Sequence, residues 1–320
     1  MSTFLKINHF EVLLTSSDNY GFIKVFSLRI FGNDQKGHML EPIQKAELNR
    51  NILGFLNYLL IKRVNYHIVK DLPRIDQIKN LSLARYHQLR HRKLSSKGFC
   101  SIQKMNTESL DVGYNKINTL NIDHLSPNLL VLDLNHNPLS KIKIKNQSEW
   151  PSLLTYLDLS NNKLKERVIA KIQWPNSILY LNLDNSRITS LKTLKTLPEN
   201  LRYLSLNSCP IKTIYNKDKS DKNYLNYKLP SELIQLNLNV IGKCPQIGQN
   251  KGLKIELPAK LMGLSITAPR WKSLRWIKFP STLLILKLYK VELDTSSSSF
   301  ASEISDISNL QQLKITVTRD

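Results

Sequence analysis

Residues 154–164 read LTYLDLSNNKL, in which Leu154, Leu157 and Leu159 are followed by Asn162 and Leu164. Alternate residues of a strand point to opposite faces, so the leucines of this LxxLxL pattern lie on one face of a short strand. The Asn position suits a side chain that hydrogen-bonds the backbone where the strand ends. One such turn cannot bury its own leucines, and it therefore needs similar turns stacked against it.

The same spacing recurs from about residue 78 to residue 320. The central leucines of the aligned copies are Leu81, Leu110, Leu132, Leu157, Leu181, Leu204, Leu236, Leu264, Leu286 and Leu313. Most of the steps between them lie in or close to the interval of about 20 to 29 residues found in short repeat units. Prolines also recur six residues before a central leucine, where a fixed φ and a missing donor suit the turn ahead of a strand. These prolines are Pro151, Pro175, Pro198, Pro230, Pro258 and Pro280.

These motifs resemble leucine-rich repeats. The local form Leu197-Pro198-x-x-Leu201-x-x-Leu204-x-Leu206 is similar to repeats of leucine-rich proteins of budding yeasts, some of which carry an F-box. The resemblance implies an α/β fold, a leucine-rich repeat solenoid with a parallel sheet on its concave side. It also implies binding, usually of another protein, and no chemistry. The fold serves many partners, so it does not identify this one.

The N-terminal quarter, residues 1–76, is interpreted as a cap or as divergent first repeats, and residues 77–320 as a solenoid of about ten turns. Val25-x-x-Leu28-x-Ile30 fits the repeat spacing and lies about two turns before Leu81. Residues 42–63 are predicted to form a helix, because Pro42 suits a first helical turn and an apolar face follows it. An F-box would also be helical, but the only early Leu-Pro pair, Leu72-Pro73, leads into the repeats.

Composition restricts the partner without choosing it. The 320 residues carry 46 Lys and Arg against 25 Asp and Glu, a net charge of +21, which admits nucleic acid, an anionic lipid surface or an acidic protein. No apolar run approaches the roughly 18 residues of a membrane span, and no secretory signal is read in the first residues. Three widely separated cysteines, Cys100, Cys209 and Cys244, favour a reducing compartment, cytoplasmic or nuclear.

The outward strand positions give the main binding hypothesis. Tyrosines recur one residue before successive central leucines, beside a row of Asp and Asn. This acidic row disfavours phosphates in the concavity, and tyrosine is enriched in protein-binding hot spots. We therefore expect a partner protein with a basic or mixed surface, although these residues also suit a sheet face that is merely solvated. The predicted site comprises Tyr156, Tyr180, Tyr203, Asp133, Asp158, Asp184, Asn182 and Asn207.

Positive charge concentrates in residues 77–107 and 251–281. Arg90, Arg92 and Lys93 form a possible anion-binding cluster, for which a solvated basic loop is the alternative. The second stretch places Trp271 among cations, a pattern that can bind phosphate and stack bases. However, Trp271 falls in an apolar repeat position, and we predict that it belongs to the core together with Trp150 and Trp174.

No catalytic constellation is recognised, because the sequence has neither a phosphate-binding glycine loop nor a Gly-x-Ser-x-Gly turn. His87 and His91 have a metal-like spacing, but no Cys or acidic residue completes a site. We therefore expect no enzyme activity, cofactor or metal. Three functions stay open: a protein-interaction scaffold, a subunit of a nucleic-acid or chromatin complex that uses the basic flanks, and a substrate receptor of a ubiquitin ligase.

Overall fold

The computed structural model describes the strands at residues 2–7, 10–16, 25–32, 58–62 and 80–82 as backbone, together with residues 101–102 and 255. It describes backbone and side chains for residues 94–100, 106–143, 149–212, 229–242, 256–293, 304–305 and 307–317. The chain divides into two compact units, Met1–Asp158 and Leu159–Asp320.

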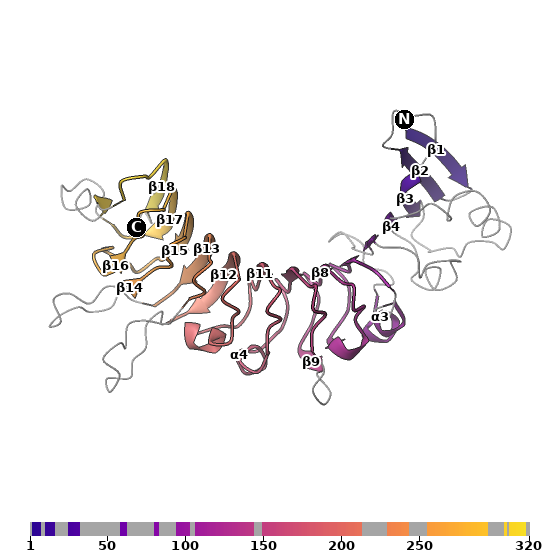
Figure 1. The fold of residues 1–320 in the computed structure, drawn as a ribbon, viewed down its shortest axis with the longest axis horizontal. Helices are drawn as coiled ribbons and strands as arrows, with labels where there is room; N and C mark the ends of the chain where they lie inside the picture. The colour runs from indigo at the N-terminus through magenta and orange to yellow at the C-terminus, as the bar shows by residue number, and fades with distance from the viewer. Residues whose placement is uncertain are drawn as a thin grey trace. The chain divides into compact units, whose positions relative to one another are not determined.

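The first unit is built on one sheet that changes from antiparallel to parallel (Figure 1). β1 pairs antiparallel with β2 and β2 with β3, and each later neighbour is parallel. The strands, in their order across the sheet, are β1 (Ser2–Ile7), β2 (Phe10–Ser16), β3 (Val25–Gly32), β4 (Tyr58–Lys62), β5 (Asn80–Ser82), β6 (Ser109–Asp111), β8 (Val131–Asp133) and β10 (Tyr156–Asp158). The returning segments carry α3 (Ser96–Ile102), β7 (Thr119–Asn121), η3 (Ile122–His124) and β9 (Lys141–Lys143).

The repeat extends toward the N-terminus through β3 and β4, and β4 lies where the sequence predicts a helix at residues 42–63. Leu28 pairs with Leu59, and Leu59 pairs with Leu81, so the pattern at residues 25–30 does lie two turns before Leu81. The intervening turn uses β4, which shows that the prediction of a helix over 42–63 is wrong at residues 58–62. Residues 42–57 lie outside the described residues, so the cap and the F-box alternative stay predictions.

The second unit continues with parallel strands only. Its main sheet contains β11 (Tyr180–Asn182), β12 (Tyr203–Ile211), β13 (Gln235–Val240), β15 (Gly263–Thr267), β17 (Ile285–Val291) and β18 (Gln312–Val317). The returning segments carry α4 (Glu166–Ile169), η4 (Leu191–Leu194) and the parallel pair β14 (Ile255–Glu256) and β16 (Ile277–Lys278). In Figure 1 these short elements lie on the opposite side of the coil from the main strands.

The predicted central leucines align across each sheet and form the core. Leu110 pairs with Leu132 in the first unit, and the strand registers of the second unit join Leu181 through Leu204 and onward to Leu313. Central leucines from Leu110 to Leu286 are 0–1% exposed, whereas Leu313 on the last described strand is 41% exposed. Trp150, Trp174 and Trp271 are buried as predicted.

Side chains at the Asn position link several turns to the turn before them. Asn115 accepts a hydrogen bond from the Leu94 N–H at 3.0 Å, and Asn137 accepts one from the Ile117 N–H at 2.9 Å. Later turns hold Ser186 and then Cys209 in this position, with the Cys209 thiol 3.3 Å from the Leu183 carbonyl oxygen. The pairing of β12 with β13 shifts in register after Leu206, in the turn where Cys209 takes the Asn position.

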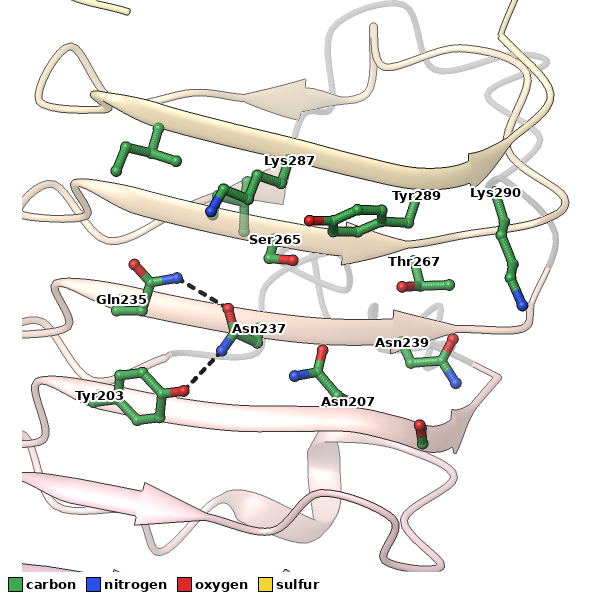
Figure 2. Close-up of a pocket in the computed structure, with 13 residues that line it drawn as sticks. Tyr203, Asn207, Gln235, Asn237, Asn239, Ser265, Thr267, Lys287, Tyr289 and Lys290 are labelled. Atoms are coloured by element: carbon green, nitrogen blue, oxygen red, sulfur yellow. Dashed lines mark hydrogen bonds between the residues drawn. The ribbon is translucent and has the colours of Figure 1, made fainter. Parts of the chain in front are cut away.

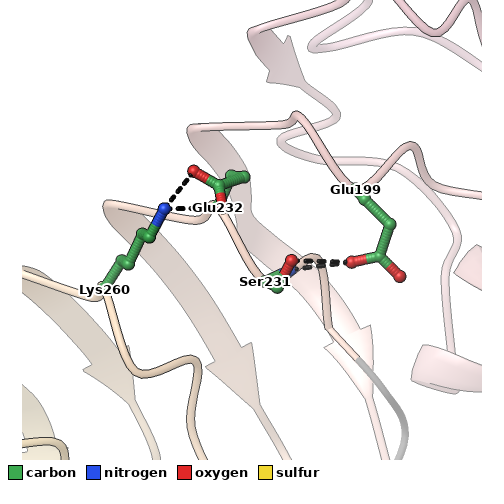
Figure 3. Close-up of polar contacts among 4 residues, drawn as sticks. All are labelled: Glu199, Ser231, Glu232 and Lys260. Carbon is green, nitrogen blue, oxygen red and sulfur yellow. Dashed lines mark hydrogen bonds and ion pairs between the residues drawn. The ribbon is translucent and has the colours of Figure 1, made fainter.

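The recurring prolines form the turns ahead of the strands. The carbonyl oxygen of Pro198 accepts from the Leu201 N–H at 3.2 Å, and Pro151, Pro175, Pro230, Pro258 and Pro280 do the same three residues before their own leucine or isoleucine. Figure 3 shows the polar links beside these turns. Glu199 accepts from the N–H and hydroxyl of Ser231, both at 3.0 Å, and Lys260 pairs with Glu232 at 2.6 Å. Exposed pairs of this kind contribute only about 0–1 kcal/mol each.

A residue with left-handed backbone recurs at one position in six of the described repeats. Its φ lies between +49° and +56°, and it stands four positions after the central leucine. Only glycine adopts this region without cost, so side chains placed here hold the strand exit at some expense in backbone strain. These residues are Tyr114, His136, Asn161, Asn185, Ser208 and Lys290.

Candidate functional site

Two of the predicted tyrosines form one stacked pair on the solvent side of the second unit. Tyr180 of β11 and Tyr203 of β12 are register partners, and their ring centroids are 4.2 Å apart with planes inclined by 6°. Both residues are half-buried, because each ring covers part of the other. Tyr156 occupies the same strand position on β10 of the first unit. The pair is therefore one aromatic unit rather than two independent side chains, with one face of each ring covered by the other.

The first unit carries a row of three carboxylates at the next outward position. Asp111, Asp133 and Asp158 are register partners on β6, β8 and β10, which places like charges on adjacent strands. Asp133 Oδ1 accepts from the Asn135 N–H at 2.9 Å, and Asp111 accepts from the Gly113 N–H at 3.1 Å. These bonds, two residues along the chain, turn the backbone at the strand end.

Burial and repulsion together keep part of this row neutral. Burial of the carboxyl raises the pKa of Asp133 to about 7, the Asn135 N–H opposes this, and the charges of Asp158 and Asp111 add to it. Asp158 is only 6% exposed, so little of its carboxylate reaches solvent. The row is thus less anionic and less accessible at neutral pH than the sequence suggests.

Asp184 is used mainly inside the protein. Its carboxylate accepts from the Ser205 hydroxyl at 2.6 Å and from the Asn207 N–H at 2.7 Å, both on β12. Asn182 in turn accepts from the Asp184 N–H at 3.0 Å. The structure brings Asp184, Asn182 and Asn207 together around the strand ends beside Tyr203, but their polar groups are largely occupied by one another.

A groove lies on the same face of the second unit (Figure 2). It has a volume of about 810 Å³, and its floor follows β15, where Ser265 and Thr267 are the outward lining residues and both are small. Amide side chains of β13 stand on one side, and Lys287 and Tyr289 of β17 stand on the other. Gly263 has a specific role, because a Cβ there would lie 1.9 Å from Oε1 of Gln235.

The amide side of the groove is ordered by hydrogen bonds. Gln235 Nε2 donates to Asn237 Oδ1 at 2.9 Å, and Asn237 Nδ2 donates to the Tyr203 hydroxyl at 3.0 Å. Asn239 Nδ2 donates to the Cys209 carbonyl oxygen at 3.1 Å. Each amide is therefore fixed in orientation, which reduces the entropy that a ligand would have to remove on binding.

The remaining predicted residues divide clearly. Arg90, Arg92 and Lys93 lie outside the described residues, as do His87, His91 and Cys244. Cys209 is buried, and this burial raises the pKa of its thiol to about 12. Among the residues with described structure, no group of three or more His, Cys, Asp or Glu residues could hold a metal ion. The described helices include none that is long and apolar enough to cross a membrane.

Comparison with known proteins adds evidence on the fold. No family model and no curated protein matches this sequence. The structure is similar to the Toll–Spätzle complex from Drosophila, with a TM-score of 0.50 and 14% identity over 99% of this chain and 51% of that chain. It is also similar to the APL1 leucine-rich repeat domain, with a TM-score of 0.49 and 16% identity over 82% of this chain and 62% of that one. The mouse RP105/MD-1 complex has a TM-score of 0.45 and 14% identity over 82% of this chain and 53% of that chain.

The parallel strands in register and the buried, stacked leucines of the LxxLxL pattern form a leucine-rich repeat solenoid. The chain spans about half to three fifths of the length of these three proteins. At such identities the likeness establishes the leucine-rich repeat architecture alone.

The groove was missed in the sequence, although a signal for it exists. The outward positions of the repeat at Leu264 are Gly263, Ser265 and Thr267, a small set between amide-rich and lysine-bearing repeats. A register built on the central leucines identifies this run of small residues. It does not reveal whether neighbouring side chains cover the resulting space.

Proposed function

We propose that this leucine-rich repeat protein is a non-enzymatic scaffold that binds a partner protein through the outward Tyr and Asp positions of its strands. The stacked Tyr180–Tyr203 pair carries this proposal. Flat, half-buried aromatic surface supplies large contact area at low entropic cost, and tyrosine is enriched among residues that dominate binding energy. A solved structure with a similar fold, that of Toll with Spätzle, is a complex between proteins, which supports a role in protein binding.

The partner surface is proposed to be basic or mixed. Asp111, Asp133 and Asp158 present carboxylates on adjacent strands, and a cationic group placed against them relieves their mutual repulsion. Such a partner favours the ionised form of Asp133, whose pKa is raised to about 7. By linkage, affinity should increase as the pH rises from about 6 to about 8.

The free, buried thiol of Cys209 and the free, exposed thiol of Cys100 support a reducing location, cytoplasmic or nuclear, as a second part of this proposal. Imaging of a tagged full-length chain tests it, and accumulation in an oxidising compartment would contradict it.

The binding experiment pairs two substitutions at one position. A pull-down identifies a partner, and its affinity is then measured for the wild type, Tyr180→Ala and Tyr180→Phe. The alanine variant should lose more than about 1 kcal/mol of binding energy, whereas the phenylalanine variant keeps the ring stack and most of the affinity. Folding should weaken by only about 0.5–1.5 kcal/mol, the usual worth of an aromatic pair.

Two results would refute the proposal. One is an unchanged affinity for alanine variants of Tyr156, Tyr180 and Tyr203. The other is a pH dependence between about 6 and about 8 that is the same in the wild type and in Asp133→Asn.

A further inference from the structure

The β15 groove, defined by Leu264, Ser265 and Thr267 and by the residues of β13 and β17 on either side, has the dimensions of a site for one extended chain. Its two walls stand on β13 and β17, which are separated by two strand spacings, about 10 Å. Its floor runs along the 5 residues of β15, about 17 Å at 3.3 Å per residue. An extended segment of similar length can therefore lie along the strand between the walls.

The charge of the groove has one sign. Lys287 and Lys290 line it, and no carboxylate is among the lining residues. Neither lysine forms an ion pair within the part of the chain that the structure describes. Lys314 of β18 is the register partner of Lys287, and its ammonium lies 5.5 Å from the centre of the Tyr289 ring. Like charges directly opposite each other on adjacent strands are unfavourable, and an anionic ligand between them removes that cost.

The side chains around the groove match a peptide better than bases. The amide nitrogens of Asn207, Asn237 and Asn239 donate within the protein, but each side-chain carbonyl oxygen has two lone pairs and can accept from the N–H groups of a peptide. Stacking of bases on aromatic rings would require an open ring face. One face of Tyr203 is covered by Tyr180, and Lys314 lies over the ring of Tyr289.

We propose that the β15 groove binds an extended acidic peptide segment of a partner protein, whose carboxylates pair with Lys287 and Lys290. The inference rests on the protein-interaction function proposed above, but it assigns a neighbouring surface that shares Tyr203 with the tyrosine pair and has the opposite charge preference. The carboxylate row of the first unit would select a cationic segment, and the groove an anionic one.

The experiment measures fluorescence anisotropy of labelled peptides with the full-length chain at low salt. The probes are a peptide of alternating Glu and Ser, the same peptide with Gln for Glu, a Lys and Ser peptide, and a single-stranded oligouridylate. We expect the Glu peptide to bind at least about tenfold more tightly than the Gln peptide, because charge-assisted hydrogen bonds are worth about 1.5–3 kcal/mol each.

Three variants separate the groove from the general positive charge. Lys287→Gln with Lys290→Gln should weaken binding of the Glu peptide at least about tenfold. Lys192→Gln with Lys195→Gln removes the same charge from exposed positions at η4, away from the groove, and should change affinity less than about twofold. Ser265→Phe leaves the charge unchanged but fills the floor, and it should weaken binding as strongly as the groove pair does.

Several outcomes would overturn the proposal. These are equal losses for the groove pair and the η4 pair, full binding by Ser265→Phe, equal affinity for the Glu and Gln peptides, or selective binding of the oligouridylate. The scaffold proposal is tested separately. It predicts that Tyr180→Ala reduces binding of a cationic partner while the Glu peptide still binds, and it fails if the affinity for that partner is unchanged.

Discussion

Asn137 provides the strictest test of how neighbouring turns are held together. Its Oδ1 accepts from the buried Ile117 N–H at 2.9 Å. Its Nδ2 lies 3.0 Å from the carbonyl oxygens of Val112 and Leu134 and 3.1 Å from that of Asn135. One buried amide thus serves two consecutive turns, so we predict that Asn137→Ala weakens their association and not only its own loop.

The cost can be worked out group by group. The Val112 carbonyl oxygen keeps a hydrogen bond from Asn115 Nδ2, so its loss is small. The Asn135 carbonyl oxygen likewise keeps the Tyr114 N–H at 2.9 Å. The Ile117 N–H loses the Asn137 Oδ1 acceptor, and an unsatisfied buried donor costs about 1–3 kcal/mol. The Leu134 and Asn135 carbonyl oxygens each lose a hydrogen bond worth about 0.5 kcal/mol. Added to about 2 kcal/mol for the Ile117 N–H, these losses should lower the free energy of unfolding by about 3 kcal/mol.

Urea denaturation measures the total loss, and hydrogen exchange locates it. Unfolding of repeat arrays can be local, so the decisive observation is the amide of Ile117, which should lose protection in Asn137→Ala. Asn176→Ala is the matched control, because this side chain is exposed and its removal should change stability by less than about 0.5 kcal/mol. A loss below about 1 kcal/mol with unchanged protection of the Ile117 amide would refute the reasoning.

Three further predictions concern the core, the carboxylate row and the left-handed position. Leu181→Ala should cost about 2–5 kcal/mol in urea denaturation through the cavity that it leaves, while Leu153→Ala, at a side chain 50% exposed, should cost far less. The pKa of Asp133 is raised to about 7 in the folded state, so between about pH 4 and pH 7 the folded chain holds a proton that the unfolded chain has lost. The melting temperature should therefore fall as the pH rises from about 4 to above 7, and Asp133→Asn should flatten that profile. Lys290→Gly should leave thermal stability unchanged or higher by up to about 1 kcal/mol because φ is +54°, whereas Lys287→Gly in the strand should lose about that amount.

The inward half of the fold could be predicted because burial leaves few choices. A shift of one residue would turn every leucine toward solvent, so the spacing of Leu132, Leu181 and Leu204 determines the register unambiguously. The prediction was wrong at Leu59 because an apolar run at mixed spacings of three and four is compatible with a helix. The same run contains Leu56-x-x-Leu59-x-Ile61, the spacing of the repeat itself. For a short apolar stretch, the neighbouring strands decide between these structures, and their positions are not apparent in the local pattern.

The outward half was harder because one residue type can serve either the backbone or a partner. Asp133 and Asp184 were both placed on the correct face, yet most of their hydrogen bonding is directed into adjacent backbone and side chains. The small outward residues of β15 attracted no prediction, because they gain significance only from what stands beside them. A binding surface on a repeat protein is therefore a property of several consecutive turns. In the second unit that surface opens where β15 contributes only the small side chains of Ser265 and Thr267 between the longer residues of β13 and β17.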